Sequence, residues 1–243
     1  MWINPKINPK LSRHFPAAGK KSKRTVRYSV QMTYAHRIRK LLLPSEERIF
    51  KRLKTPQRIQ DYLDTLPMNF ESKGETCMSP REVLHQRVAH CFEGALLAAS
   101  VLAYHGLPPL LLDLQTISED EDHVVALFRQ HDHWGAISKT NHAILRWRDP
   151  IYRSVRELAM SYFHEYVLWN NGKKSLLAHS APFELRRFAP EQWITAEENL
   201  FWLAETLDDS RHFPIVPKKN KRLLRKASKV ELRAMRIVEW KEP

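Results

Sequence analysis

Residues 91–105 constrain the fold more than any other segment, because they are apolar on almost every side. Leucine, alanine, valine and phenylalanine fill most positions, so a helix formed here has no polar face to turn toward water. Gly106 provides a C-terminal stop, and the prolines at 108 and 109 bar continuation. The longest apolar run, 94–104, is much shorter than the roughly 20 residues that cross a bilayer. We therefore predict a helix buried inside a domain, and no transmembrane segment.

Strand-like segments follow this helix. Residues 110–116 and 123–129 are rich in Leu, Val and Phe, an acidic loop lies between them, and residues 134–137 form a third such segment after a polar turn. Helical starts are predicted before this region at Ser45, Pro56 and Ser79, and after it near residues 154 and 195. This order predicts an α+β fold, with the apolar helix packed on an antiparallel sheet and extra helices at both ends.

Charge is divided unevenly along the chain. The formal net charge is +13, and counting along the sequence assigns +14 to residues 1–60, −8 to residues 61–216 and +7 to the remainder. We expect a basic flexible arm at 1–44, a core with leading helices at 45–170, and a helical C-terminal extension with a basic tail at 171–243. A fold built around a nucleic-acid groove would carry positive charge in its body. The basic termini are therefore the candidate contacts for an acidic partner or nucleic acid, with a solvated tail as the favoured alternative.

Cys91 begins the apolar helix, where a thiol has unusual chemistry. Unpaired amide groups and the helix dipole favour the thiolate and so lower the pKa of the side chain. The alternative is an inert buried cysteine, which is the common fate of a lone thiol. Cys77 precedes a predicted helix and is expected to be a bystander, although it could pair with Cys91 under oxidation. Two cysteines cannot form a disulfide framework, so we expect a reducing compartment and a cytoplasmic location.

A catalytic thiol needs a histidine partner, and His123 occupies a suitable place at the start of the second predicted strand after Cys91. The acids at 119–122 favour the protonated form of its ring. The cluster at 131–133 has donor atoms suited to a metal, but it lies in a predicted turn without further ligands. Six glycines leave no phosphate-binding loop. We therefore expect neither a metal nor a cofactor.

Three segments together resemble the transglutaminase-like superfamily. RVAHCFEGALLAA at 87–99, closed by HGLP at 105–108, resembles its nucleophile helix; DHVVALF at 122–128 resembles its histidine strand; WGAI at 134–137 resembles the tryptophan-containing strand that follows. The match covers about residues 55–170 and looks closest to bacterial transglutaminase-like cysteine peptidases. It implies a papain-like α+β fold. It also implies cleavage or transfer at an amide bond of a protein or peptide substrate, through a thioester acyl-enzyme.

The resemblance also implies residue roles. Cys91 would be the nucleophile and His123 the general base and acid. The third residue of the family, usually Asp, lies four positions after the Trp, and here that place holds Ser138, whose hydroxyl cannot stabilise an imidazolium as a carboxylate does. Asn141 is an equally ranked candidate for this role, and Gln86 is the candidate oxyanion donor by similarity to papain-like sites. Ser138 leaves a second function open, a catalytically degenerate domain that binds protein or nucleic acid.

Overall fold

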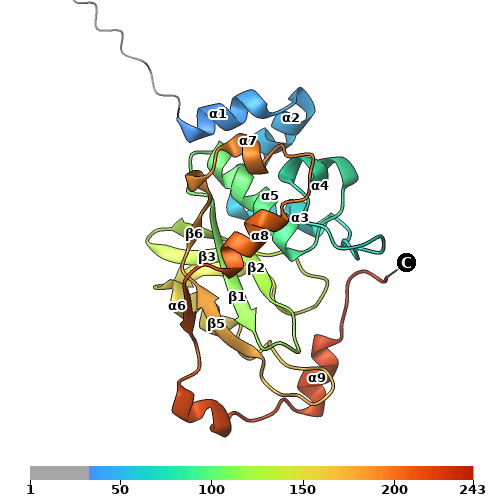
Figure 1. The fold of residues 1–243 in the computed structure, drawn as a ribbon, viewed down its shortest axis with the longest axis vertical. Coiled ribbons are helices and arrows are strands. Elements are labelled where there is room, and N and C mark those ends of the chain that lie inside the picture. The colour runs from blue at the N-terminus through green and yellow to red at the C-terminus, as the bar shows by residue number, and fades with distance from the viewer. Residues whose placement is uncertain (1–32, 243) are drawn as a thin grey trace, which may run out of the picture. The chain divides into compact units, whose positions relative to one another are not determined.

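An antiparallel sheet organises residues 33–242, the part of the chain that this computed structural model describes (Figure 1). Its spatial order is β4–β3–β2–β1–β5–β7, and β6 shares the edge of β1 with β5. The α+β class predicted from the sequence is therefore correct. The strands are β1 (Leu110–Thr116), β2 (His123–Gln130), β3 (His133–Ile137), β4 (Arg148–Tyr152), β5 (Leu176–Ser180), β6 (Phe183–Glu184) and β7 (His212–Pro214).

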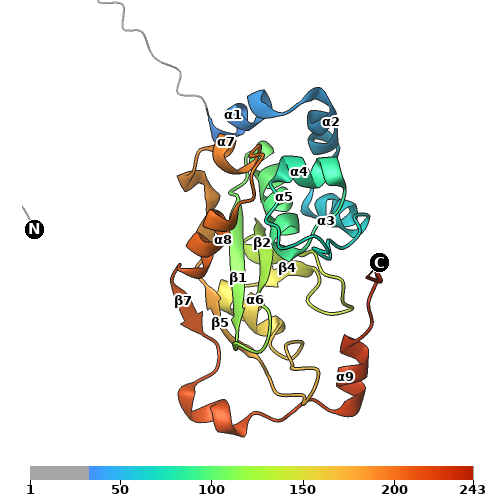
Figure 2. The ribbon, with the colours of Figure 1, turned by 45° about the vertical axis from the view of Figure 1, so that its right-hand side comes forward.

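Helix α5 (Cys91–Tyr104) is the buried helix that the sequence predicts, and every residue after Cys91 is buried. One side packs on β1 and β2, and the other sides meet helices α1, α3 and α4 (Figure 2). Gly94 permits a close approach, because a Cβ there would lie 2.5 Å from the Cβ of Lys139. The start of α5 thus lies directly against the chain that leaves β3. The surrounding helices are α1 (Tyr34–Leu41), α2 (Pro44–Arg52), α3 (Pro56–Asp64) and α4 (Pro80–Gln86).

Both faces of the central strands are covered, which explains why β1 and β2 lack a polar alternation. Val124, Ala126 and Phe128 of β2 join the core that contains α5. The intervening Val125 and Leu127 join a second core on the opposite face. Helix α6 (Val155–Ser161) packs in the second core, whereas α7 (Pro190–Trp193) and α8 (Phe201–Asp208) contribute buried residues to the first.

The predicted domain boundaries at residues 44 and 170 do not match the fold. Residues 34–41 form α1, capped by Thr33, and its buried Ile38 joins the main core; the rest of the predicted arm, 1–32, lies outside the described residues. Beyond residue 170, β5 pairs with β1 and β7 pairs with β5, so this region completes the sheet. These strands are short, which hid them from the sequence analysis. After β7 the chain leaves the sheet and forms a 3-10 helix (Lys218–Leu223) and α9 (Lys229–Met235), which Figures 1 and 2 show beyond β7.

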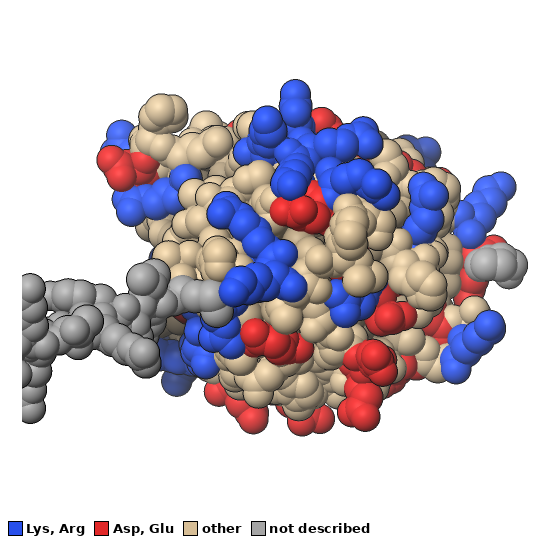
Figure 3. Space-filling view, turned by 90° about the horizontal axis from the view of Figure 1, so that it is seen from above, with Lys and Arg blue, Asp and Glu red and all other residues tan. Residues whose placement is uncertain are grey.

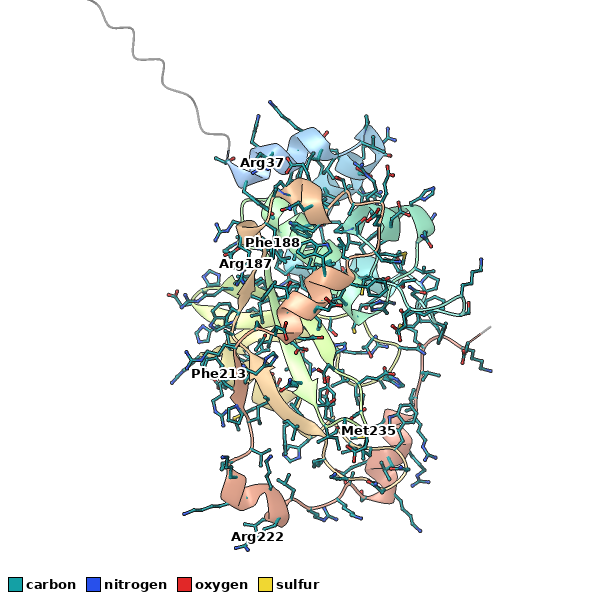
Figure 4. All side chains as sticks on the ribbon, in the orientation of Figure 1. Arg37, Arg187, Phe188, Phe213, Arg222 and Met235 are labelled. Atoms are coloured by element: carbon teal, nitrogen blue, oxygen red, sulfur yellow. The ribbon has the colours of Figure 1, made fainter. Side chains whose placement is uncertain are left out.

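Positive charge covers the end of the molecule formed by α1, α2 and α7, which Figure 3 views from above. Arg39, Lys40, Arg48 and Lys51 are exposed there, and Arg37 is labelled on α1 in Figure 4. Part of the charge that the sequence assigned to a basic arm therefore lies on folded helices. No helix within residues 33–242 has both the length and the apolar character that a membrane span requires.

Candidate active site

A cavity of about 540 Å³ opens at the N-terminus of α5. Cys91 lines it from the first turn of that helix, and His123 lines it from the first residue of β2. The structure therefore brings together the two residues that the sequence singled out. Three loops supply most of the remaining wall: the acidic loop 118–122, the segment 139–145 after β3 and the segment 165–169. Met68 and Met235 also line it, and Figure 4 labels Met235 on α9.

The His123 ring is held by a chain of hydrogen bonds that fixes its tautomer. Its Nε2 lies 2.8 Å from the Ser138 hydroxyl oxygen, and that hydroxyl donates its own proton to the carbonyl oxygen of Leu145. Because the Ser138 proton is committed, Ser138 accepts from His123, and Nε2 must carry hydrogen. The Nδ1 atom is left to face the Cys91 sulfur. Ser138 thus occupies the orienting place, as one of the two predicted candidates.

Ser138 is itself fixed from the opposite side by Gln60 of α3. The Gln60 side-chain amide accepts from the main-chain N–H of Ser138 at 2.9 Å and donates to its carbonyl oxygen at 2.8 Å. Both residues are buried. A side chain that satisfies both main-chain groups of one residue leaves that residue little freedom to move. The orienting hydroxyl is therefore positioned by α3 as well as by β3.

The imidazoles of His123 and of its neighbour His90 both act on the charge of Cys91. Burial by itself would raise the pKa of the thiol, but the hydrogen bonds and charges of the two rings outweigh burial and hold that pKa well below its usual value. This shift favours the thiolate, and the half-buried Cys91 lies at the cavity wall. In contrast, burial together with the nearby Glu93 raises the pKa of Cys77 to about 12.

His90, the residue before Cys91, is a site residue that the sequence did not single out. Its Nε2 is 3.0 Å from the carbonyl oxygen of Thr76, 3.4 Å from Glu93 and 3.8 Å from Glu71. Burial favours the neutral ring, but the Cys91 sulfur, the Glu93 charge and the Thr76 carbonyl together raise the pKa of His90 to about 9. Its position next to Cys91 was visible in the sequence, but the groups behind the ring come from a distant loop.

Glu93 joins that loop to the start of α5. Its carboxylate accepts from the main-chain N–H groups of Met78 and His90, both at 3.0 Å, from the Thr76 hydroxyl at 2.8 Å and from the Asn69 amide at 3.1 Å. The side chain is fully buried. Buried carboxylates are tolerated where several donors surround them, as they do here. Glu93 therefore fixes both the loop 69–78 and the backbone of His90.

Of two other predicted site residues, Asn141 lines the cavity and Gln86 does not. Asn141 is engaged with the C-terminal segment, because its side chain donates to the carbonyl oxygen of Trp240 at 3.0 Å and accepts from the N–H of that residue at 2.7 Å. Gln86 is the exposed last residue of α4, and its side-chain partner is Glu82. The chain reverses at Arg87, in a left-handed conformation, before it reaches Cys91. Gln86 is thus not among the residues that line the cavity with Cys91, and its oxyanion role stays a prediction.

Two further titratable side chains border the cavity. Lys139 donates to the carbonyl oxygen of Leu66, and burial lowers the pKa of its ammonium group. Burial also raises the pKa of the Tyr166 hydroxyl well above its usual range, so Tyr166 remains neutral. Within residues 33–242, no group of three or more His, Cys, Asp or Glu side chains is arranged to hold a metal ion.

The cavity thus combines an ionised thiol, an oriented imidazole and a second, carboxylate-backed imidazole. These groups can perform nucleophilic attack and proton transfer on a carbonyl compound. The evidence for function comes from this geometry, since neither the protein-family models nor the curated proteins contain a match to the chain.

Proposed function

We propose that the protein is a cysteine-dependent hydrolase or acyl transferase that acts on an amide or peptide bond through a thioester acyl-enzyme. The observation that carries the proposal is the Cys91 sulfur at the start of α5, in contact with an imidazole whose far nitrogen is held by Ser138. A nucleophile, a base and a group that orients the base are the three parts that acyl transfer requires. All three border one cavity or lie directly behind its wall.

The reaction follows from the positions of the protons. The Cys91 sulfur attacks the carbonyl carbon and forms a C–S bond, and the unpaired N–H groups of the first turn of α5 stabilise the oxyanion. His123 delivers its Nδ1 proton to the leaving nitrogen as the C–N bond breaks. Water or an amine then attacks the thioester, gives a proton back to His123 and releases the thiolate of Cys91. Protons balance over the cycle, and no oxidant or metal is needed.

The arrangement of elements supports a papain-like, transglutaminase-like core. A helix that begins with the nucleophile packs on an antiparallel sheet, the histidine begins β2, and the orienting residue follows β3, the strand next to β2. This is the order that the sequence resemblance implies. Ser138 departs from the Asp of that family, and its hydrogen bond to His123 supports a working rather than a degenerate site.

Reaction with p-nitrophenyl acetate tests the proposal against the alternative of a binding module. We expect a burst of one p-nitrophenolate per chain and an acetyl group on Cys91, detected by peptide mass spectrometry. C91A is expected to abolish the burst, whereas the matched variant C77A is expected to retain it. No burst in the wild type, or an equal burst in C91A, would favour the binding module. Incubation with casein then separates the possible reactions, through cleaved bonds, deamidated glutamines or cross-links.

A further inference from the structure

We propose that His90 is a second catalytic histidine, a fixed cation that keeps Cys91 ionised while His123 is free to gain and lose its proton. This inference deepens the proposed function and rests on it. It assigns different tasks to the two rings that contact one sulfur. The assignment follows from the hydrogen-bond partners of each ring, which differ in charge and in number.

The partners of His90 fix where its hydrogens lie. Its Nε2 is 3.0 Å from the carbonyl oxygen of Thr76, a group that can only accept, so Nε2 carries hydrogen. The other ring nitrogen faces the Cys91 sulfur. If that sulfur is a thiolate, it can only accept as well, and both nitrogens of His90 must then be protonated. An imidazolium is the form that satisfies both neighbours at once.

Negative charge surrounds the ring on the side away from the cavity. Glu93 Oε1 is 3.4 Å and Glu71 Oε1 is 3.8 Å from His90 Nε2, and the His90 side chain is only 14% exposed. At this burial the charges are weakly screened. Other titratable groups near the pair are Glu75 and Cys77, and His123, Lys139, His142 and Tyr166 line the same cavity as Cys91. Of these, His123, Lys139 and His142 can carry positive charge, whereas Glu93 and Glu71 are the charged groups that lie 3.4 and 3.8 Å from His90 Nε2. The surroundings therefore stabilise the charged ring, in agreement with its raised pKa.

The group behind the Nε2 of His123 is the hydroxyl of Ser138, which accepts a hydrogen bond but carries no charge. The charge of Asp113 acts on His123 through space, whereas Glu93 and Glu71 lie 3.4 and 3.8 Å from His90 Nε2. Two carboxylates next to the ring oppose the loss of a proton from His90. A base that cycles and a cation that persists are complementary in acyl transfer. In charge, Glu93 beside His90 takes the place of the carboxylate that the resemblance to the transglutaminase-like superfamily implies.

The pH dependence of Cys91 alkylation by iodoacetamide tests this division. We expect H90Q to raise the midpoint of the alkylation profile by about one pH unit or more. H123Q removes the other ring that lowers the pKa of Cys91, so it also raises the midpoint, and in addition it slows release of the acetyl group from Cys91. H85Q, on the exposed end of α4, is the matched histidine control and should match the wild type. An unchanged midpoint in H90Q, or loss of the low-pH thiolate in H123Q alone, would overturn the inference.

E71Q provides a second test if H90Q does not fold. Gln can still accept from the main-chain N–H of Thr76, which Glu71 Oε1 binds at 2.6 Å, so the loop is retained while one charge near His90 is removed. We expect the alkylation midpoint to rise by about half a pH unit. An unchanged Cys91 alkylation midpoint in folded E71Q would contradict a positively charged His90. Failure of the proposed function differs visibly, because the p-nitrophenyl acetate burst would then be absent while Cys91 still alkylates at low pH.

Discussion

The two histidines beside Cys91 differ in what lies behind each ring. His123 comes from the sheet and has the neutral hydroxyl of Ser138 behind it, whereas His90 comes from the loop side and has the buried carboxylate of Glu93. In the proposed division, His90 supplies a lasting positive charge and His123 exchanges protons, although both rings act on one sulfur. In a catalytic triad one histidine with one carboxylate performs both tasks. The comparison teaches that an absent carboxylate behind one histidine does not by itself make a thiol site inactive.

A third histidine, His212, shows why a hydrogen-bonded carboxylate does not by itself identify a catalytic histidine. His212 Nε2 lies 2.8 Å from Asp113, and this hydrogen bond raises the pKa of the ring. The pair joins β7 to β1, away from the residues that line the cavity around Cys91. An aspartate and a histidine in contact are therefore structural here. The distinguishing feature of His123 and His90 is the ionised thiol between them.

Changing Glu93 to Gln should remove the buried charge that supports His90, and we expect the largest effect from this variant. The substitution removes the buried charge and turns an amide N–H₂ toward groups that donate, such as the main-chain N–H of Met78. We expect unfolding to become easier by about 2–4 kcal/mol, and the Cys91 alkylation midpoint to rise. Denaturant titration and the alkylation profile measure the two effects. E157Q, at the start of α6, is the matched control, and equal stability of E93Q and E157Q would contradict the buried-network interpretation.

Changing Ser138 to Ala should remove the hydrogen bond that orients His123. The ring loses its orienting acceptor, so we expect turnover of p-nitrophenyl acetate to fall about 10- to 100-fold, less than the roughly 10⁴-fold loss known for a triad aspartate. The alkylation midpoint should move little, because His90 still supports the thiolate. The control is S100A, a buried serine of α5 that donates to a main-chain carbonyl. A midpoint shift as large as that of H90Q would show that the two rings share one task.

Changing Asn141 to Ala should leave the hydrogen-bond partners of both histidines unchanged, and we expect the smallest effect from this variant. The variant loses two hydrogen bonds to Trp240, so we expect a stability loss of about 1–2 kcal/mol and faster proteolysis of the C-terminal segment. Alkylation and turnover at Cys91 should match those of Q86A, whose side chain lies on the exposed end of α4. A large loss of turnover in N141A, with normal stability, would return Asn141 to the catalytic role that the sequence suggested.

Local sequence patterns and the order of the elements along the chain predict part of this site. The apolar run after Cys91 predicts α5, and the order of helix and strands predicts that His123 returns to the start of that helix. The partner of Asn141 could not be predicted, because Trp240 is 99 residues away and no local signal marks the contact. His90 was missed for a related reason, since its meaning depends on Thr76 and Glu71 in an irregular loop. The short strands β6 and β7 have too few residues to show a period.

The most direct test of the account is the rate of Cys91 alkylation in the wild-type protein as a function of pH, with Cys77 as the internal reference. Because the two imidazoles hold the pKa of Cys91 well below its usual value, we expect the thiolate to predominate at neutral pH. The account predicts a rate that changes less than about threefold between about pH 6 and 8.5, while Cys77 stays unmodified. A rate that rises about tenfold per pH unit over the same range, as for an ordinary thiol, would contradict it.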